Sequence, residues 1–333
     1  MSPRGIFLSI LSRGLIPSLR SGQALKPEGL KDLIRSTLIK MSCKICGSFN
    51  ITKIFDAANT HGRHVWNKSA EFGIYRCGEC EAIFVGDVAV DNEYFSKYYP
   101  RDYYASEAGG GLVNQLLGVF GRMIISFKES GILKYFSLPN NAKLKILDIG
   151  CGSGEFLANI NSCVFEKYGL EVNPQGIARC RERKIKVFDK ELKDAGFSSD
   201  SFDVITMWHV LEHLDKPADL LLEARRILKN NGILMIATPN TDSLGFRYGR
   251  KNWFHLDSPR HLVLYNRKSL GFLLHKTRFK TVDLKNIFYD FPLDLFWSLR
   301  GSMCKYFIYP LYPLFKLISE ETLLVAARKY GQV

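Results

Sequence analysis

The sequence contains no uninterrupted apolar run of about 18 residues, the length that a membrane-spanning helix needs. The hydrophobic stretches near its start are interrupted by Arg4, Arg13 and Arg20. The same arginines argue against a secretory signal peptide. Internal repeats and low-complexity segments are also missing, and 333 residues are too many for a small disulfide-stapled scaffold. These absences leave a globular, non-repetitive protein.

Acidic residues are scarce relative to basic ones. The chain has 46 Lys and Arg against 33 Asp and Glu, a net charge of +13. Such a charge favours anionic partners, for example nucleic acid, phosphorylated metabolites or an acidic membrane surface. The composition, with 46% hydrophobic, 13% aromatic and 24% charged residues, is typical of a folded chain and not of a disordered or collagenous one. The length corresponds to about two domains of roughly 150 residues each.

Residues 1–40 form a basic leader that we leave out of the predicted fold. They contain two acids, Glu28 and Asp32, and seven basic residues: Arg4, Arg13, Arg20, Lys26, Lys31, Arg35 and Lys40. Together with several serines, this composition resembles that of a transit peptide. The alternative is a mis-assigned start, because Met41 stands just before the first cysteine pair.

Four of the eight cysteines form two C-x-x-C pairs: Cys43 with Cys46, and Cys77 with Cys80. Two such pairs can supply four thiolates in a tetrahedral array to Zn²⁺, and a site with four protein ligands is structural, since it keeps no position open for water. The alternative of two disulfides or four idle thiols is weaker, because glycines beside the pairs are typical of zinc ribbons. The histidines between the pairs, His61 and His64, are alternative ligands, although surface positions suit them better.

The other four cysteines are scattered: Cys151, Cys163, Cys180 and Cys304. We interpret them as buried apolar residues or inert thiols, which agrees with a reducing cytoplasmic location.

The chain divides into three parts after the leader. Residues 41–105 are rich in Cys, Gly and aromatics, with short strand-like runs at 50–55 and 72–75, and form the predicted metal-binding module. Residues 106–143 contain apolar positions at helical intervals and form a linking helix or lid. Residues 144–331 alternate strands with helices, which predicts an α/β fold: a doubly wound, Rossmann-like, mostly parallel sheet with helices on both faces.

Within the third part, the predicted strands are 145–149, 168–172, 185–188, 202–207, 232–237, 280–288 and 321–328. Helices are expected from Glu155, near Pro174 and over 218–228. An aromatic insertion at 289–317 separates the last two strands.

A glycine-rich loop follows the first of these strands and opens a helix, a position suited to a nucleotide-type ligand. Its glycines are Gly150, Gly152 and Gly154. The dinucleotide fingerprint G-x-G-x-x-G fails in both registers, because Glu155 and Leu157 occupy the third glycine position. The loop has no Lys or Arg, and its flanking acids, Asp148 and Glu155, would repel a pyrophosphate. The loop therefore favours an uncharged or cationic ligand group.

Glu171 ends the second strand, where a carboxylate can accept both hydroxyls of an adenosine ribose. Residues 147–154 and Glu171 resemble the first motif and the ribose-binding acid of the class I S-adenosylmethionine-dependent methyltransferases. Further matches follow at 202–205, 209–214, 226–228 with Gly232, and 238–240. The matches span most of residues 144–287.

The resemblance implies S-adenosyl-L-methionine as the cofactor. Asp189 and Leu192 would flank its adenine, and Met207 and His209 would line its cleft. Ordinary core packing is the alternative for Leu192 and Met207 taken singly. The full set of expected cofactor-binding residues is Asp148, Gly150, Gly152, Gly154, Glu171, Asp189, Leu192, Met207 and His209.

Transfer of a methyl group to a hydroxyl requires a base for the hydroxyl proton. Our preferred base is His261, in a segment (253–270) that resembles the substrate loop of a methyltransferase subgroup. His213, at the carboxyl edge of the sheet, is the second candidate, although a structural role for it is the better interpretation. The neighbouring Arg260 could bind a phosphate or carboxylate of the acceptor, or be a solvated surface residue.

Two aromatic groups allow two interpretations each. The first group follows the second cysteine pair and comprises Tyr94, Phe95, Tyr98, Tyr99, Tyr103 and Tyr104. These aromatic side chains could stack on the acceptor or pack two domains together. The insertion 289–317 suits either a helix pair that caps the substrate pocket, which we favour slightly, or an interfacial helix on an anionic membrane leaflet. Pro310 and Pro313 would break a long surface helix.

The N-terminal module resembles the zinc-binding domain that precedes the methyltransferase domain in some bacterial sugar methyltransferases. The chain lacks their long extra C-terminal domain, which argues against C-methylation of a deoxysugar. We therefore expect methylation of a small-molecule acceptor, foremost a sugar hydroxyl on a nucleotide-linked or lipid-linked polysaccharide intermediate.

Methylation of a quinone-like or phenol-like lipid is one alternative, and a zinc-ribbon RNA methyltransferase is another. The nucleic-acid alternative is weakened because seven basic residues lie in the leader and no basic stripe interleaved with aromatics lies near the cysteine pairs. The expected location is cytoplasmic, with peripheral contact to the inner membrane face through 289–317 as an option.

Overall fold

The computed structural model describes residues 41–58, 71–86, 88–99, 112–137, 142–287 and 290–331. The chain splits into two compact units, Met1–Met41 and Ser42–Val333, and every described helix and strand belongs to the second. The predictions for the leader and for His61, His64, Tyr103 and Tyr104 lie outside the described residues. Among the described residues, no helix is long and apolar enough to cross a bilayer.

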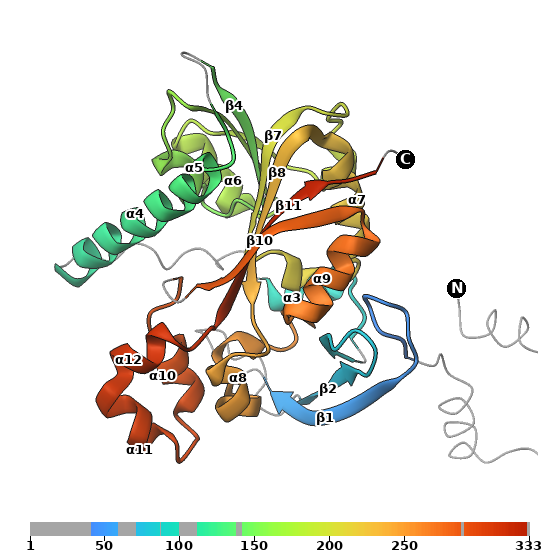
Figure 1. Cartoon of the computed structure of the whole chain (residues 1–333), viewed down its shortest axis with the longest axis vertical. Coiled ribbons are helices and arrows are strands. Elements are labelled where there is room, and N and C mark those ends of the chain that lie inside the picture. Colours follow the sequence, from blue (N-terminus) through green and yellow to red (C-terminus); the bar gives the residue numbers. More distant parts are fainter. Residues whose placement is uncertain are drawn as a thin grey trace, which may run out of the picture. The chain divides into compact units, whose positions relative to one another are not determined.

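A seven-stranded sheet forms the centre of the second unit (Figure 1). Its strand order is β10-β11-β8-β7-β4-β5-β6, and β11 runs antiparallel to both of its neighbours. The strands are β4 (Leu144–Ile149), β5 (Phe165–Leu170), β6 (Lys186–Phe188), β7 (Phe202–Trp208), β8 (Leu228–Pro239), β10 (Phe279–Ile287) and β11 (Thr322–Lys329). The predicted α/β fold with a doubly wound, mostly parallel sheet is confirmed.

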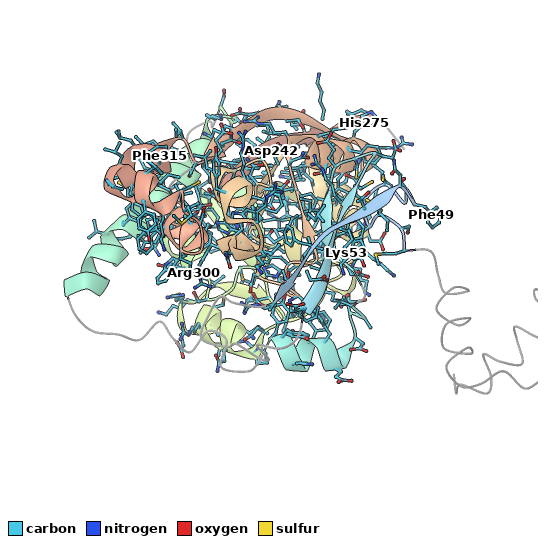
Figure 2. The ribbon with its side chains drawn as sticks, turned by 90° about the horizontal axis from the view of Figure 1, so that it is seen from below. Phe49, Lys53, Asp242, His275, Arg300 and Phe315 are labelled. Atoms are coloured by element: carbon cyan, nitrogen blue, oxygen red, sulfur yellow. The ribbon has the colours of Figure 1, made fainter. Side chains whose placement is uncertain are left out.

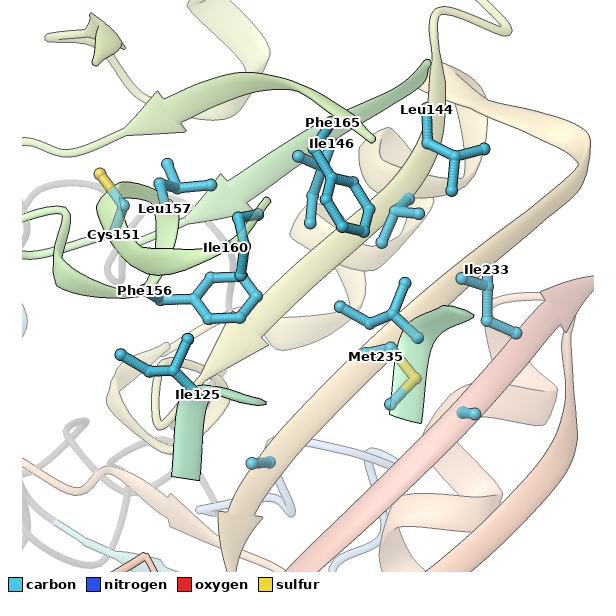
Figure 3. Packing of buried hydrophobic residues seen from close by; sticks show 14 of the residues in the cluster. Ile125, Leu144, Ile146, Cys151, Phe156, Leu157, Ile160, Phe165, Ile233 and Met235 are labelled. Carbon is cyan, nitrogen blue, oxygen red and sulfur yellow. The ribbon is translucent and has the colours of Figure 1, made fainter. Parts of the chain in front are cut away.

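Helices cover both faces of this sheet, with α4, α5 and α6 on one side and α7 and α9 on the other (Figure 1). Their bounds are α4 (Leu112–Leu133), α5 (Glu155–Asn159), α6 (Pro174–Glu182), α7 (Pro217–Ile227) and α9 (Arg267–Lys276). Figure 3 shows how Ile125 of α4 and Phe156 of α5 pack with strand residues such as Met235 in the buried core. Burial on both faces explains why the central strands β8 and β11 contain continuous apolar runs, at 233–237 and 323–327, instead of alternating patterns.

The strand order reverses between β4 and β7. From β4 the chain proceeds outward through β5 and β6, and then returns to β7 and β8 on the other side. Ligands of open α/β sheets bind at the carboxyl ends of the strands beside such a reversal. A ligand site is therefore expected at this position.

The Cys-rich segment forms a second, four-stranded sheet of order β1-β2-β3-β9. Its strands are β1 (Ile51–Ala58), β2 (Glu71–Cys77), β3 (Ile83–Val85) and β9 (Val263–Leu264). The last strand comes from the loop after β8, and pairs Ile83 with Leu264 and Phe84 with Val263. Side-chain contacts add to this joint: Lys44 binds Asp215 at 2.6 Å, and Lys276 donates to the Ile45 carbonyl at 2.6 Å. The Cys-rich segment is thus built onto the predicted substrate loop.

Short helices fill the remaining segments: α3 (Asn92–Tyr98), η2 (Leu192–Asp194), η3 (Leu211–His213), α8 (Leu244–Gly249), η4 (Arg250–Asn252), η5 (Phe254–Leu256), α10 (Asp294–Leu299), α11 (Lys305–Ile308), η6 (Tyr309–Leu311) and α12 (Tyr312–Leu317). In the aromatic insertion, Pro310 and Pro313 lie in the first turns of η6 and α12. Proline cannot donate a backbone hydrogen bond within a helix, so the insertion divides into short helices at these positions.

Candidate active site

The glycine-rich loop connects β4 to α5 at the reversal point of the sheet. Gly150, Gly152 and Gly154 all have left-handed backbones, with φ of +68°, +55° and +74°. A Cβ on Gly150 would lie 2.6 Å from Cγ2 of Val210, and one on Gly154 would lie 2.5 Å from Cδ1 of Ile185. Glycine is therefore required at both positions by conformation and by space. The contact with Val210 also brings the loop against the segment that follows β7.

Glu171 joins the loop to the end of β5. Its Oε2 accepts a hydrogen bond from the Gly152 N–H at 2.8 Å, and its Oε1 accepts from the N–H groups of Val172 and Asn173, both at 2.8 Å. A carboxylate has about four acceptor positions, so one remains on Oε2 for a ligand hydroxyl. The arrangement leaves room for one ribose hydroxyl of S-adenosylmethionine, whereas the sequence predicted contacts with both hydroxyls.

Asp148 lies beneath the loop at the end of β4 and is only 2% exposed. The Thr206 hydroxyl donates to its Oδ1 at 2.6 Å. Burial raises the pKa of the Asp148 carboxyl to about 7, although the Thr206 hydrogen bond and the charge of Lys128 oppose the shift. Asp148 is therefore held inside the domain, where it ties β4 to β7.

The other residues expected to bind the cofactor differ in how exposed they are. Met207 is fully buried within β7, and Leu192 of η2 is 3% exposed. Asp189 is exposed and lies 3.4 Å from Arg181. The expectations that Asp189 and Leu192 flank the adenine, and that Met207 lines the cofactor cleft, remain proposals.

His209 follows β7 in a left-handed backbone conformation, with φ of +55°. Its Nδ1 lies 3.2 Å from Oε1 of Glu212, and its Nε2 lies 3.1 Å from Oδ2 of Asp290. Burial lowers the pKa of His209, but the hydrogen bonds to Asp290 and Glu212 outweigh it and raise the pKa to about 9. His209 is therefore an imidazolium that donates from both nitrogens.

A second cation, Lys128, binds one of the carboxylates that hold this imidazolium. Lys128 lies 3.2 Å from Oδ1 of Asp290, and its ammonium lies 4.4 Å from the ring centroid of Trp208. Asp290 is 81 positions from His209 and Lys128 belongs to α4, so no local spacing in the sequence predicts this group.

The two predicted bases lie together. The rings of His213 and His261 meet edge to face, with centroids 4.6 Å apart. Nδ1 of His261 donates to the carbonyl of His255 at 2.6 Å, which leaves a lone pair on Nε2. Nδ1 of His213 lies 2.8 Å from the hydroxyl of Tyr99 and 3.2 Å from the carbonyl of Arg260.

Both histidines are neutral at pH 7. Burial lowers the pKa of His261, and burial followed by the charge of His261 lowers the pKa of His213 to about 4. A neutral imidazole with a free Nε2 lone pair can accept a proton. Glu212 lies in the same group, 0% exposed, and accepts a hydrogen bond from Thr238 at 3.0 Å.

The loop that carries His261 is held by its neighbours. Arg260 is 7% exposed and donates to Oδ1 of Asp257 at 2.7 Å, so the interpretation of a solvated surface arginine is excluded. Tyr94 is buried and its hydroxyl donates to the Pro259 carbonyl at 3.1 Å. Tyr94 therefore packs α3 against the loop, whereas Tyr99 reaches His213.

Three groups of described residues have donor atoms within 4.8 Å of one another, as a metal site needs. In the first, the sulfurs of Cys43 and Cys80 are 3.5 Å apart and those of Cys46 and Cys77 are 3.4 Å apart, with all four thiols free. Zn–S bonds of about 2.3 Å in a tetrahedron place sulfurs about 3.8 Å apart. The four-cysteine group therefore fits Zn²⁺.

The other two groups already have protein partners. One consists of Glu212, His213 and His261, which bind Thr238, Tyr99 and the His255 carbonyl. The other consists of His255, Asp294 and Glu321. In the latter, Lys316 and His255 bind Asp294 at 2.6 and 3.1 Å, and Glu321 accepts from the Trp253 indole at 2.8 Å.

Comparisons with known proteins agree with this geometry. A family profile described as "Methyltransferase domain" matches residues 127–284. A "probable S-adenosylmethionine-dependent methyltransferase" of Mycobacterium tuberculosis is 29% identical over 166 residues, which cover 49% of this chain and 58% of that protein. The mitochondrial ubiquinone biosynthesis O-methyltransferase of Candida albicans is 33% identical over 116 residues, covering 31% of this chain and 35% of that protein.

Among solved structures, an S-adenosylmethionine-dependent methyltransferase of Archaeoglobus fulgidus superposes with a TM-score of 0.45 and 20% identity, covering 62% of this chain and 94% of that one. The chain spans little more than half the length of the Mycobacterium relative. Residues 127–284, just under half of the chain, thus match a methyltransferase domain, and the same part of the chain is similar to S-adenosylmethionine-dependent methyltransferases.

Proposed function

We propose that this protein transfers a methyl group from S-adenosylmethionine to a hydroxyl group of a small molecule held beside His261. The observation that carries the proposal is the pairing of a glycine loop and ribose-type acid with a neutral histidine pair at one edge of the sheet. The loop reaches the histidines through Val210, which contacts Gly150 and precedes Glu212 and His213 by two and three positions.

The cofactor would be held by the loop 150–154 and by Glu171, with Asp189 and Leu192 near the adenine and Met207 and His209 near the cleft. When bound, S-adenosylmethionine would supply a methyl carbon activated by a sulfonium, so the acceptor has to present a nucleophile, in this proposal the oxygen of a hydroxyl group. His209 is a fixed cation whose charge is balanced by Glu212 and Asp290. Its role is to order the turn after β7, because both of its nitrogens are engaged.

His261 would remove the acceptor proton. Its Nδ1 is fixed on the His255 carbonyl, so the proton goes to Nε2. The cation that forms lies 4.0 Å from the Asp257 carboxylate and near Glu212, and both charges favour it. His213 packs against the ring and keeps its orientation.

The acceptor class that the site favours is a phenolic hydroxyl of a quinone-like molecule. Phe291 lies between His209 and His255, with ring centroids 5.0 and 5.1 Å away, and Phe254 extends the aromatic wall. The Candida relative is by name an O-methyltransferase of ubiquinone biosynthesis. A sugar hydroxyl is the second candidate, supported by the resemblance of residues 253–270 to a sugar-methyltransferase loop.

The four-cysteine group would bind one structural Zn²⁺ and stabilise the module at 41–105. Because β3 of this module pairs with β9, the metal would also support the loop that carries His261. We retain the division into this module, the helical segment 106–143 and the methyltransferase domain 144–331, with its insertion at 289–317, as part of the proposal.

The test is to incubate the full chain with methyl-labelled S-adenosylmethionine and a bacterial extract, and to separate aqueous from organic-soluble products. Label in the organic phase that co-migrates with quinones supports the phenolic acceptor. Label in the aqueous phase supports the sugar acceptor instead. Label in neither phase, from a chain that binds S-adenosylhomocysteine, overturns the proposed transfer.

A further inference from the structure

The C-terminal helices present an unusually apolar surface. Of the 21 large hydrophobic side chains that are exposed in the described part of the chain, ten lie between residues 293 and 318. The most exposed are Phe307 at 79%, Met303 at 75% and Tyr306 at 64%. We call the exposed side chains of residues 293–318 the C-terminal face. Contiguous exposed apolar surface of this kind marks an interaction site.

This face is exposed because the short helices bury only a few of their apolar side chains against one another. Leu295 and Leu299 of α10 and Ile308 of α11 form the small buried cluster beneath it. The breaks at η6 and α12 then turn the remaining apolar side chains outward, including Leu314 and Ile318 at 62% exposure each. Figure 2 shows Arg300 and Phe315 on these helices at one end of the unit that contains them.

The exposed charges around the face are mostly basic, with Glu320 as an exposed acid at its end. Residues 291–319 contain a single acid, Asp294, which is 2% exposed and binds Lys316. Arg300 is exposed on the segment. Arg250 and Lys251 are exposed on η4, which packs against α10. The net solvent-facing charge of this surface is therefore cationic.

An open pocket of about 390 Å³ adjoins one end of the face. Leu317 and Ile318 belong to both the pocket and the face, while Arg267 and Lys285 contribute two cations and Glu320 one carboxylate. The two cations outnumber the single carboxylate, which suits the phosphate group of a lipid.

We propose that the C-terminal face docks on the surface of an anionic lipid bilayer. The aromatic residues Trp297, Tyr306 and Phe307 would enter the headgroup region, where such side chains are favoured, and the cations would face lipid phosphates. A second copy of the chain fits less well, because a two-fold contact would bring the like charges of Arg250, Lys251 and Arg300 together. The inference does not depend on the methyl acceptor.

Docking in this way has a consequence for the candidate active site. Phe291 lies three residues before the start of α10 and contacts His209 and His255. The site therefore borders the surface that would face the membrane, and a lipid-borne acceptor would have a short path to it.

The test is flotation of the full chain with vesicles of phosphatidylcholine alone and with added phosphatidylglycerol, over a series of salt concentrations. We expect binding to the anionic vesicles that weakens with salt. The Met303→Ser/Phe307→Ser double variant and the Lys251→Glu/Arg300→Glu variant should each lose at least about tenfold in affinity. Matched controls are Leu222→Ser on α7 and Lys143→Glu before β4, which replace exposed residues elsewhere and should bind normally.

Circular dichroism of each variant verifies that it is folded, which is expected because every changed side chain is exposed. Unchanged vesicle binding by the Met303→Ser/Phe307→Ser variant overturns the proposal, because this result would assign membrane contact to another part of the chain. Equal binding to both vesicle types overturns it as well. A third outcome is that the wild-type chain binds no vesicles but self-associates in sedimentation, and that the Met303→Ser/Phe307→Ser variant does not self-associate. This outcome would overturn the proposal and assign the face to a second copy of the chain.

Discussion

The carboxylate of Glu171, at the end of β5, accepts a hydrogen bond from the backbone N–H of Gly152 in the loop after β4, over 2.8 Å. This contact joins the carboxyl ends of two neighbouring parallel strands. It holds the glycine loop in place and leaves one acceptor position on Oε2 of Glu171 beside the loop. The contact is the structural basis of the proposed cofactor site.

Replacement of Glu171 by Ala should weaken binding of S-adenosylhomocysteine by between ten- and about a hundredfold. The physical reason is the loss of a charge-assisted hydrogen bond, worth roughly 1.5–3 kcal/mol. Isothermal titration calorimetry measures the change. Glu166→Ala on the exposed side of the same strand is the matched control. Equal affinities of the two variants would contradict the ribose assignment.

His261→Ala should lower methyl transfer by about two to four orders of magnitude, the usual contribution of a general base, while binding of S-adenosylhomocysteine stays unchanged. His275→Ala, an exposed histidine on α9, serves as the control. Because the pKa of His261 is lowered by burial, wild-type activity should persist below pH 6.5. Retention of wild-type turnover by His261→Ala would exclude it as the base.

Cys77→Ser should remove zinc from the protein, since the other three thiolates cannot complete a tetrahedral site. Elemental analysis of the purified chain should show about one zinc per wild-type chain and almost none in the variant. Cys163→Ser, which changes an exposed single cysteine, should leave the zinc content unaltered. Chelation should also lower activity, because β3 pairs with β9 next to the His261 loop. A zinc-free wild-type chain with intact activity would refute the proposed structural metal.

Stability should decrease between pH 6.5 and 9 because of His209. Its pKa is raised to about 9 in the folded chain from an ordinary value of 6.5. The stabilisation is therefore complete below pH 6.5 and is lost as the pH rises through 9, by a few kcal/mol at most, given about 1.4 kcal/mol per pKa unit. The raised pKa of Asp148 acts at lower pH, between 3.8 and about 7.

The measurement is the free energy of unfolding in urea at pH 7.5 and pH 9.5, which lie above the pKa of about 7 of the buried carboxyls of Asp148 and Glu321. His209→Asn is a suitable variant, because Asn tolerates the left-handed backbone at this position. We expect the variant to lose the pH dependence over this range, while His275→Asn keeps it. Parallel slopes for the wild type and His209→Asn would show that the ion pairs with Glu212 and Asp290 do not stabilise the fold.

The sequence by itself determined the α/β class, the position of the glycine loop and the pairing of the cysteines. These features are local: each strand is a short apolar run, glycine alone accepts the backbone of Gly150 and Gly154, and C-x-x-C spacing brings two sulfurs together within one turn. The observed start of a strand differs from the predicted one where a polar, turn-like stretch belongs to the strand. The strand β8 begins at Leu228 instead of Gly232, since pairing with β7 extends it through a polar stretch that resembles a turn.

Only the tertiary structure decided which distant residues meet. The strand β9 has two residues and no periodicity, so its union with the Cys-rich sheet depends on pairing across about 180 positions. His209 binds Asp290 at the start of the insertion, which in turn binds Lys128 of α4. His261 is oriented by the backbone of His255. The electrostatic environment of a buried side chain depends on the charges and hydrogen-bonding groups around it. Those neighbours are assembled by packing and are not encoded in any short stretch of sequence.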